Sequence, residues 1–218
     1  MEVTQKSKRL SIRHIARSCF SVTFGGKTVY FEPRRIPKGY PRADFVLTAR
    51  DRAPQFRSHS PGLMARTEAK VYYKAENGVG RFAVSSRSLR PGEGLDFGEM
   101  KFRAVPTYSI HRRFHPKKNN RLGFLVECGD IRLYYSADVG FIPEMAEVTG
   151  VDYALMPLGG KRGAARDEAV DAARLMRPRS IIPIDASSDE AEAFKSKVGN
   201  FVPDVHVITL NAGSPHEI

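Results

Sequence analysis

Serine nucleophiles and phosphate-binding loops each have a characteristic motif, and this sequence contains their residue types without the required spacing. A serine nucleophile is marked by a G-x-S-x-G turn, and Ser18, Ser109 and Ser136 all lie outside such a turn. The string Gly159-Gly160-Lys161 lacks the spacing of a P-loop, so it favours a backbone turn over a phosphate contact. The sequence therefore predicts neither a serine hydrolase nor a P-loop nucleotide site.

Positive charge is the chemical property that the composition does supply. Lysine and arginine total 35 against 24 acidic residues, which gives a formal net charge of +11. Residues 1–60 carry 13 basic and 4 acidic side chains, residues 61–140 carry 14 and 8, and residues 141–218 carry 8 and 12. An excess of this size favours anionic partners, and a basic face must come mainly from the first two thirds of the chain.

Cysteine usage and hydropathy indicate the compartment. Cys19 and Cys128 have no C-x-x-C spacing, so we expect neither a disulfide framework nor a thiolate zinc site, and we expect both thiols to be buried. The opening string MEVTQKSKRL has no apolar signal region, and no window approaches the roughly 18 apolar residues of a membrane helix. We therefore expect a cytoplasmic protein without a membrane span.

The elements that must position any site begin with short β-rich runs in the first 135 residues. Gly25-Gly26 predicts a hairpin turn because both glycines can adopt positive φ, and Cys128-Gly129-Asp130 predicts a second hairpin. The predicted strands are Leu10 to His14, Ser18 to Phe24, Thr28 to Phe31, Asp44 to Leu47, Lys70 to Tyr73, Met100 to Val105, Gly123 to Glu127 and Ile131 to Tyr135.

The C-terminal third alternates strands with helices. Val151 to Met156 and Ser180 to Ile184 have the composition of buried strands, whereas Ala164 to Met176 and Ser188 to Val198 have helical spacing. Residues Asp185 to Asp189 supply candidate N-caps for the last helix. Because no linker divides the chain, we expect residues 1–218 to form one layered α/β domain.

Several short strings follow one another in a characteristic order. They are Ile15-Ala16-Arg17-Ser18-Cys19-Phe20, similar to L-G-H-S-C-F, Val29-Tyr30-Phe31-Glu32-Pro33, similar to I-L-I-D-P, Phe114-His115-Pro116-Lys117, Gly123-Phe124, Phe141-Ile142-Pro143-Glu144-Met145, and Asp152 to Gly160, similar to D-x-A-L-L-P-x-G-G. In this order they resemble the metallo-β-lactamase superfamily, in its branch of metal-dependent hydrolases related to ascorbate-6-phosphate lactonase. The resemblance runs from about Ser11 to Gly213. It implies a four-layer αββα sandwich of two mixed β-sheets flanked by helices, with a cleft where the motif loops meet.

The resemblance also locates the metal-ligand positions, most of which are changed. The family motif T-H-x-H-x-D-H supplies three histidines and an aspartate to two metal ions. Its ligand positions here hold Ala49, Asp51, Ala53 and Pro54, and later ligand positions fall on Ser109, Asp138 and Asp185. Arg17 replaces the histidine of the opening G-H-S. Three carboxylates, Asp51, Asp138 and Asp185, therefore remain as catalytic or metal-binding candidates.

Three oxygen ligands are a poor set for zinc, which takes about four ligands and is often held by histidine or cysteine. We therefore expect no metal cofactor. The alternative is a divalent ion, Mn²⁺, Mg²⁺ or Zn²⁺, held by the three carboxylates, of which the harder ions suit oxygen best. None of the six histidines falls on a ligand position: His14, His59, His111, His115, His206 and His216.

Carboxylates that lose their metal ions need another source of positive charge if they stay buried. We hypothesise that arginine and lysine side chains supply it, either as ion pairs with the aspartates or as an anion-binding cleft. The alternative is ordinary charge on the solvated surface. The candidates lie on or beside segments that form the cleft in the family: Arg17, Arg50, Arg52, Arg112, Arg113, Lys161 and Arg162.

Three functions are compatible with this pattern. The first is a non-catalytic member of the superfamily whose basic cleft or face binds RNA, DNA or a phosphorylated ligand. The second is a divergent metal-dependent hydrolase that acts on an anionic small molecule through Asp51, Asp138 and Asp185. The third is a structural subunit that pairs with an active paralogue, so an oligomer remains possible.

Overall fold

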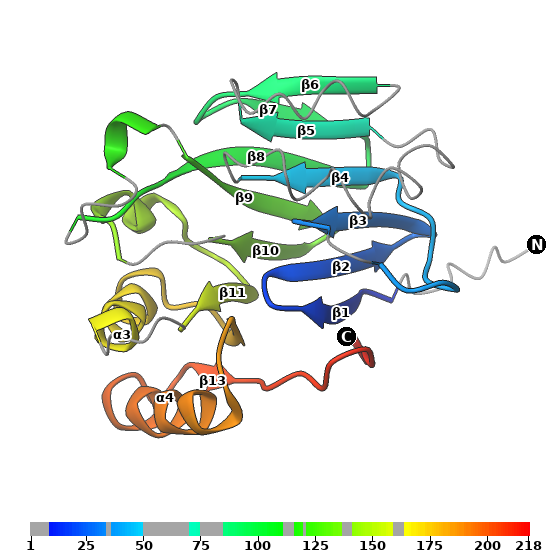
Figure 1. Ribbon diagram of the computed structural model, residues 1–218. Helices are drawn as coiled ribbons and strands as arrows, with labels where there is room; N and C mark the ends of the chain where they lie inside the picture. Colours follow the sequence, from blue (N-terminus) through cyan, green and yellow to red (C-terminus); the bar gives the residue numbers. More distant parts are fainter. Residues whose placement is uncertain are drawn as a thin grey trace, which may run out of the picture.

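The computed structural model describes residues 9–33, 36–49, 70–74, 85–110, 116–119, 121–136, 141–158 and 164–218. Within these ranges the strands form two β-sheets that lie face to face (Figure 1). The predicted architecture of two mixed sheets with flanking helices is therefore confirmed.

The first sheet has the strand order β14-β1-β2-β3-β4-β5-β6. Its strands are β1 (Ser11–Ala16), β2 (Cys19–Phe24), β3 (Lys27–Phe31), β4 (Phe45–Thr48), β5 (Lys70–Lys74), β6 (Ser85–Leu89) and β14 (Pro215–Glu217). The pairs from β14 to β3 are antiparallel, and the pairs from β3 to β6 are parallel.

The second sheet repeats this arrangement in the order β7-β8-β9-β10-β11-β12-β13. Its strands are β7 (Gly94–Asp96), β8 (Met100–Thr107), β9 (Arg121–Cys128), β10 (Ile131–Tyr135), β11 (Tyr153–Pro157), β12 (Ser180–Ile184) and β13 (His206–Val207). The pairs from β7 to β10 are antiparallel, and the pairs from β10 to β13 are parallel.

Parallel neighbours require crossover connections, and in the second sheet helical segments supply them. The 3-10 turn η3 (Pro143–Glu147) lies between β10 and β11, helix α3 (Ala164–Met176) follows β11, and helix α4 (Ser188–Phe201) follows β12. A second 3-10 turn, η2 (Lys117–Asn119), precedes β9. No helix in the described ranges is long and apolar enough to cross a membrane.

Local sequence explains how these elements begin and end. Ser187 is the N-cap of α4 and forms a capping box with Glu190, as the candidate N-caps predicted. Gly25 and Gly26 have φ of 57° and 79° between β2 and β3, which confirms the predicted hairpin. Gly129, with φ of 59°, turns between β9 and β10 and confirms the second hairpin.

Two apolar layers hold the molecule together. The inner faces of both sheets share one core, in which the rings of Phe31 and Tyr135 lie 4.7 Å apart across the sandwich. The outer face of the second sheet packs against α3 and α4, with Met156 and Phe194 in the same buried cluster. Cys19 and Cys128 are both buried, as expected.

Four strands were absent from the sequence prediction: β6, β7, β13 and β14. All four lie at sheet edges, where a strand needs little burial. Strands β6, β13 and β14 therefore lack an alternating apolar pattern, and β7 has only the three residues Gly-Leu-Asp. β14 alone pairs with a distant part of the sequence, β1, whereas β6, β7 and β13 each pair with the adjacent strand in chain order. Edge strands this short carry too little periodicity to be predicted locally.

Candidate functional site

The candidate site lies at the end of the sandwich where the parallel strands terminate. Strands β3 and β4 of the first sheet end just before Glu32 and Ala49, and strands β10 and β12 of the second end just before Ser136 and Asp185. The arrows of β4 and β10 point the same way in Figure 1. Strand β3 is parallel to β4, and β12 is parallel to β10 through β11. We call this end the carboxyl edge. Crevices at the carboxyl ends of strands are the usual place for ligands in open α/β sheets.

Asp185 is held in place by a chain of hydrogen bonds that joins the two sheets. The hydroxyl of Ser18, in the turn between β1 and β2, donates to Asp185 Oδ2 over 3.0 Å. The hydroxyl of Tyr135, on β10, donates to the carbonyl oxygen of Ser18 over 2.8 Å. Ser18 and Tyr135 are buried, so hydrogen bonds from the protein interior orient the Asp185 carboxylate.

Glu32 plays a comparable role in the first sheet. Its side chain is only 2% exposed, and Oε1 accepts a hydrogen bond of 2.6 Å from the backbone N–H of Ala49. Its own backbone N–H donates to the carbonyl of Leu47 over 3.0 Å. A buried carboxylate thus fixes the start of the segment that matches the metal-binding motif of the family.

Backbone strain is concentrated at this edge. Four non-glycine residues in the described ranges have positive φ, and three of them are Arg17 (48°), Glu32 (46°) and Asp185 (53°). The fourth, Arg177, follows helix α3. Left-handed backbone at such residues costs free energy and tends to occur where the surrounding structure fixes a functional geometry.

The described ligand positions carry no imidazole. Ala49, at a position that the sequence resemblance assigns to a ligand, is 2% exposed and belongs to the apolar core. Ser109 is buried, and Asp185 is the residue that the sequence resemblance predicts at the position of the family's last histidine. Among the residues that the structure describes, no group of three or more His, Cys, Asp or Glu side chains could hold a metal ion.

Arg17 is the predicted cation that the structure describes. Its side chain is exposed, and within the described ranges it forms no ion pair with Asp185 or any other acid. Its carbonyl oxygen lies 2.9 Å from Nε2 of His14, whose ring stacks on Phe20 at 4.6 Å. His14 therefore supports the Arg17 turn, a role that sequence spacing alone did not reveal.

Most other predicted site residues lie outside the described residues: Arg50, Asp51, Arg52, Arg112, Arg113, Asp138, Lys161 and Arg162. Their roles, as anion-binding groups or as metal ligands, remain predictions. The described part of the site brings together Arg17, Ser18 and Asp185 at one point of the carboxyl edge.

A cluster that sequence reasoning missed lies beside the Ser109 position. The Tyr108 hydroxyl donates to Glu144 Oε2 over 2.7 Å, and Lys117 Nζ donates to Oε1 of the same carboxylate over 2.7 Å. Lys117 Nζ also lies 5.2 Å from the centroid of the Tyr108 ring. We call these three residues the Glu144 clamp. The clamp connects η2 and the end of β8 to η3. Its hydrogen bond between Tyr108 and Glu144 joins residues 36 positions apart, so no local sequence pattern indicates it.

The clamp shifts the ionisation of its members. Partial burial acts to raise the pKa of Glu144, but hydrogen bonds from Lys117 and Tyr108 outweigh it and hold the pKa below the ordinary value. The hydrogen bond to Glu144 raises the pKa of Lys117. Burial, and then the same carboxylate, raise the pKa of Tyr108. All three groups therefore keep their neutral-pH charge states.

Comparison with known proteins agrees with this geometry. Residues 11–185 match the model of the beta-lactamase superfamily domain. A UPF0173 protein of Pyrococcus furiosus is 27% identical over 196 residues, which cover 83% of this chain and 87% of the relative. A UPF0173 metal-dependent hydrolase of Caldivirga maquilingensis is 20% identical over 222 residues, which cover 93% and 95%.

A solved structure shares the fold. The crystal structure of a protein from Parabacteroides distasonis superposes with a TM-score of 0.82 at 18% identity, and the match covers 94% of each chain. The narrower relation to ascorbate-6-phosphate lactonase remains a prediction. The family match over residues 11–185, together with two mixed sheets and flanking helices, shows that the chain belongs to the β-lactamase superfamily.

Proposed function

We propose that the carboxyl edge binds an anionic partner that carries phosphate groups, with RNA or DNA as the leading class, without the metal-dependent hydrolysis named for its relatives. Phosphate contacts need mainly lysine and arginine, and the chain has a formal net charge of +11. Two described ligand positions, Ala49 and Ser109, hold residues that do not serve as metal ligands of the usual kind.

The observation that carries this proposal is the environment of Arg17. Its exposed guanidinium lies at the carboxyl edge with no acidic partner among the residues described. The backbone that presents it is fixed by the left-handed turn and by the contact between His14 and the Arg17 carbonyl. A planar guanidinium on a fixed backbone, with no acidic partner in the described ranges, suits two-point contact with a phosphate.

The fit of a metal ion depends on residues beyond this described set. Asp185 is the one described carboxylate at a family ligand position, whereas a zinc site needs at least three protein ligands. The described residues therefore do not complete such a site, and the proposal contains no step that uses a metal.

Fluorescence anisotropy with a labelled single-stranded RNA tests the proposal. We expect binding at low salt that weakens steeply as salt rises, because phosphate contacts release counterions. Arg17→Gln is expected to weaken binding several-fold and to reduce the slope of log K against log salt by about one. Lys195→Gln, on the distant helix α4, is the matched control and should leave both quantities unchanged. Absence of RNA and DNA binding at low salt would refute the nucleic-acid version, and binding of a phosphorylated small molecule alone would replace it.

A divergent metal-dependent hydrolase is the second candidate. It is favoured by the hydrogen bonds from Tyr135 to Ser18 and from Ser18 to Asp185, because oriented carboxylates are typical of metal sites. The name of the Caldivirga maquilingensis relative supports the same reading.

Elemental analysis of the purified protein separates the two candidates. Stoichiometric Mn, Zn or Fe that disappears in an Asp138→Ala, Asp185→Ala double variant would favour the hydrolase. A metal content near zero in both proteins would favour the anion-binding protein.

A further inference from the structure

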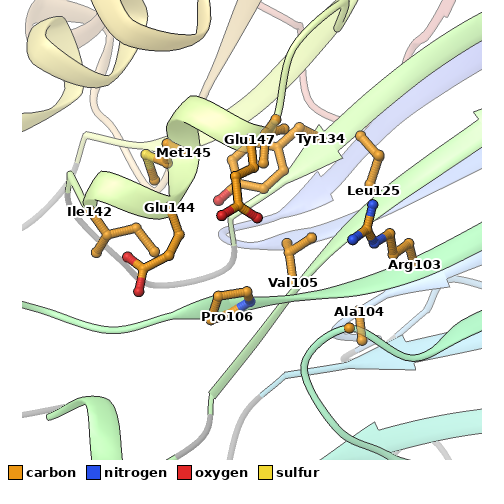
Figure 2. A pocket seen from close by; sticks show the side chains of 12 residues that line it. Arg103, Ala104, Val105, Pro106, Leu125, Tyr134, Ile142, Glu144, Met145 and Glu147 are labelled. Carbon is orange, nitrogen blue, oxygen red and sulfur yellow. The ribbon is translucent and has the colours of Figure 1, made fainter.

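A small pocket lies on the outer face of the second sheet, apart from the residues of the carboxyl edge. It has a volume of about 90 Å³ and lies between strands β8, β9 and β10 and the η3 turn (Figure 2). Its walls are mainly apolar and include Val105, Leu125, Met145 and Val148. The volume corresponds to roughly three water molecules in the liquid, so the pocket suits a ligand of few heavy atoms.

The floor of the pocket carries a polar group that the protein leaves without a partner. The Tyr134 side chain is 0% exposed, and its hydroxyl makes no hydrogen bond within the part of the chain that the structure describes. In Figure 2 this hydroxyl points into the pocket. A hydroxyl that faces the pocket offers a hydrogen bond to a ligand atom, and that bond adds to the ligand's affinity. Burial also raises the pKa of Tyr134, so the hydroxyl keeps its proton and can donate it in a hydrogen bond.

Two groups of opposite charge reach the pocket from different elements. Glu147 comes from η3 and Arg103 from β8, and Figure 2 shows both side chains directed toward the pocket. Both side chains are exposed, and neither has an ion-pair partner among the described residues. Glu144, which also lines the pocket, is already engaged by Tyr108 and Lys117.

A wider groove of about 350 Å³ adjoins the pocket and shares Arg103 and Leu125 with it. The other charged side chains of the groove form two ion pairs, Lys101 with Asp96 and Arg132 with Glu127. Arg103 is thus the groove's unpaired cation within the described ranges.

We propose that this pocket binds a small zwitterion of the amino-acid class. The ligand's ammonium group meets Glu147 and donates to the Tyr134 hydroxyl oxygen beside it, and the ligand's carboxylate meets Arg103. A short apolar side chain fits against Val105 and Leu125. A ligand with a single charge is attracted to one of the two charged side chains and repelled by the other. The pair of opposite charges therefore selects a ligand that carries both charges.

Isothermal titration calorimetry with three ligands of similar size tests the charge requirement. L-Alanine carries both charges, propionate lacks the ammonium group, and ethylamine lacks the carboxylate. We expect L-alanine to bind at least tenfold more tightly than either analogue. Failure of L-alanine to bind, or equal binding of propionate or ethylamine, would overturn the proposal.

Three variants test the residues that carry it. Tyr134→Phe removes only the hydroxyl and is expected to weaken L-alanine binding about threefold to tenfold, whereas Glu147→Gln and Arg103→Gln should each weaken it at least tenfold. Glu192→Gln, on helix α4, is the control and should leave binding unchanged. Thermal unfolding of each variant establishes that it is folded. Unchanged L-alanine binding in folded Glu147→Gln and Arg103→Gln proteins would place the ligand elsewhere and refute this site.

Discussion

At the scale of single residues, the carboxyl edge is built from strained backbone and buried hydrogen bonds. Arg17, Glu32 and Asp185 adopt left-handed conformations that ordinary side chains disfavour. The hydrogen bonds that Glu32 accepts from Ala49 and that Ser18 donates to Asp185 offset part of this cost. The site therefore depends on a few contacts, each of which substitution can test.

Replacing Ser18 with alanine removes the donor to Asp185. We expect Ser18→Ala to lower the free energy of unfolding by about 1–2 kcal/mol, because a hydrogen bond to a charged group is lost. Urea unfolding followed by far-UV circular dichroism measures the change. Ser21→Ala is the matched control, since Ser21 is equally buried but its hydroxyl has no hydrogen-bond partner in the described ranges. Equal losses in both variants would contradict a specific role for Ser18.

Gly123, on β9, is required by close packing and not by its backbone conformation. A Cβ at this position would lie 2.8 Å from the Tyr135 carbonyl oxygen and 2.8 Å from Thr107 Cγ2. Because the carbonyl is part of the neighbouring strand, we expect Gly123→Ala to destabilise the protein by at least 1–3 kcal/mol, roughly the cost of overpacking. Urea unfolding again provides the measurement.

Gly199 in helix α4 supplies the opposite case. A Cβ there meets no heavy atom within 4 Å. Gly199→Ala should therefore stabilise the protein by about 0.5–1 kcal/mol, because alanine is the better helix former.

For the other glycine, a stabilising effect of Gly123→Ala would contradict the prediction. It would show that the strands around Gly123 can move apart more easily than the close contacts suggest.

At the scale of elements, the Glu144 clamp joins three segments that the sheets alone leave separate. Tyr108 follows β8, Lys117 lies in η2 and Glu144 lies in η3. Because the clamp adjoins Ser109, it fixes one side of the candidate site. Its strength depends on pH through the shifted pKa values of its members.

The pH dependence has a definite sign. The folded-state pKa of Glu144 is lowered, so its stabilising contribution is complete above the ordinary value of 4.5 and is lost as pH falls through the lowered value. We expect Glu144→Gln to lower the melting temperature at neutral pH and to have progressively less effect as the pH falls below 4.5 and wild-type Glu144 takes up a proton. Differential scanning calorimetry across this pH range measures this. Glu147→Gln, on the same turn, should show no such change, and a pH-independent effect of Glu144→Gln would contradict the role of charge.

At the scale of the whole molecule, the two sheets share one apolar core, which draws on strands from both halves of the chain. Their topologies match: each sheet has four strands in an antiparallel run followed by three parallel strands. The C-terminal strand β14 completes this match, because it returns to pair with β1 at the edge of the first sheet.

A shared core predicts that the sheets unfold together, which also tests the expectation of one domain for residues 1–218. We expect Val22→Ala in β2 and Val126→Ala in β9, both fully buried, to lower the free energy of unfolding by about 2 kcal/mol each. In both variants the far-UV signal and the near-UV signal of the tyrosines should follow one denaturation curve. Two separate transitions, with each variant shifting only one, would indicate two independent folding units.

The sequence by itself determined the elements whose signals are local. Short β-rich runs predicted β2, β3, β10 and their neighbours, and two glycines predicted the first hairpin. Helical spacing predicted α3, and a buried-strand composition predicted β12. These signals work because burial on one face and positive φ at a turn each constrain residue type within a few positions. The order of family-like strings also predicted the sandwich of two mixed sheets.

Only the tertiary structure decided how distant residues meet. Ser18 and Asp185 are 167 residues apart, and no local pattern indicates their hydrogen bond. The clamp around Glu144 and the unpartnered hydroxyl of Tyr134 are of the same kind, because each depends on which elements pack together. Side-chain periodicity specifies which face of an element is buried. The neighbour against which that face packs is chosen by the fold as a whole, and the chemistry of this protein lies in those contacts.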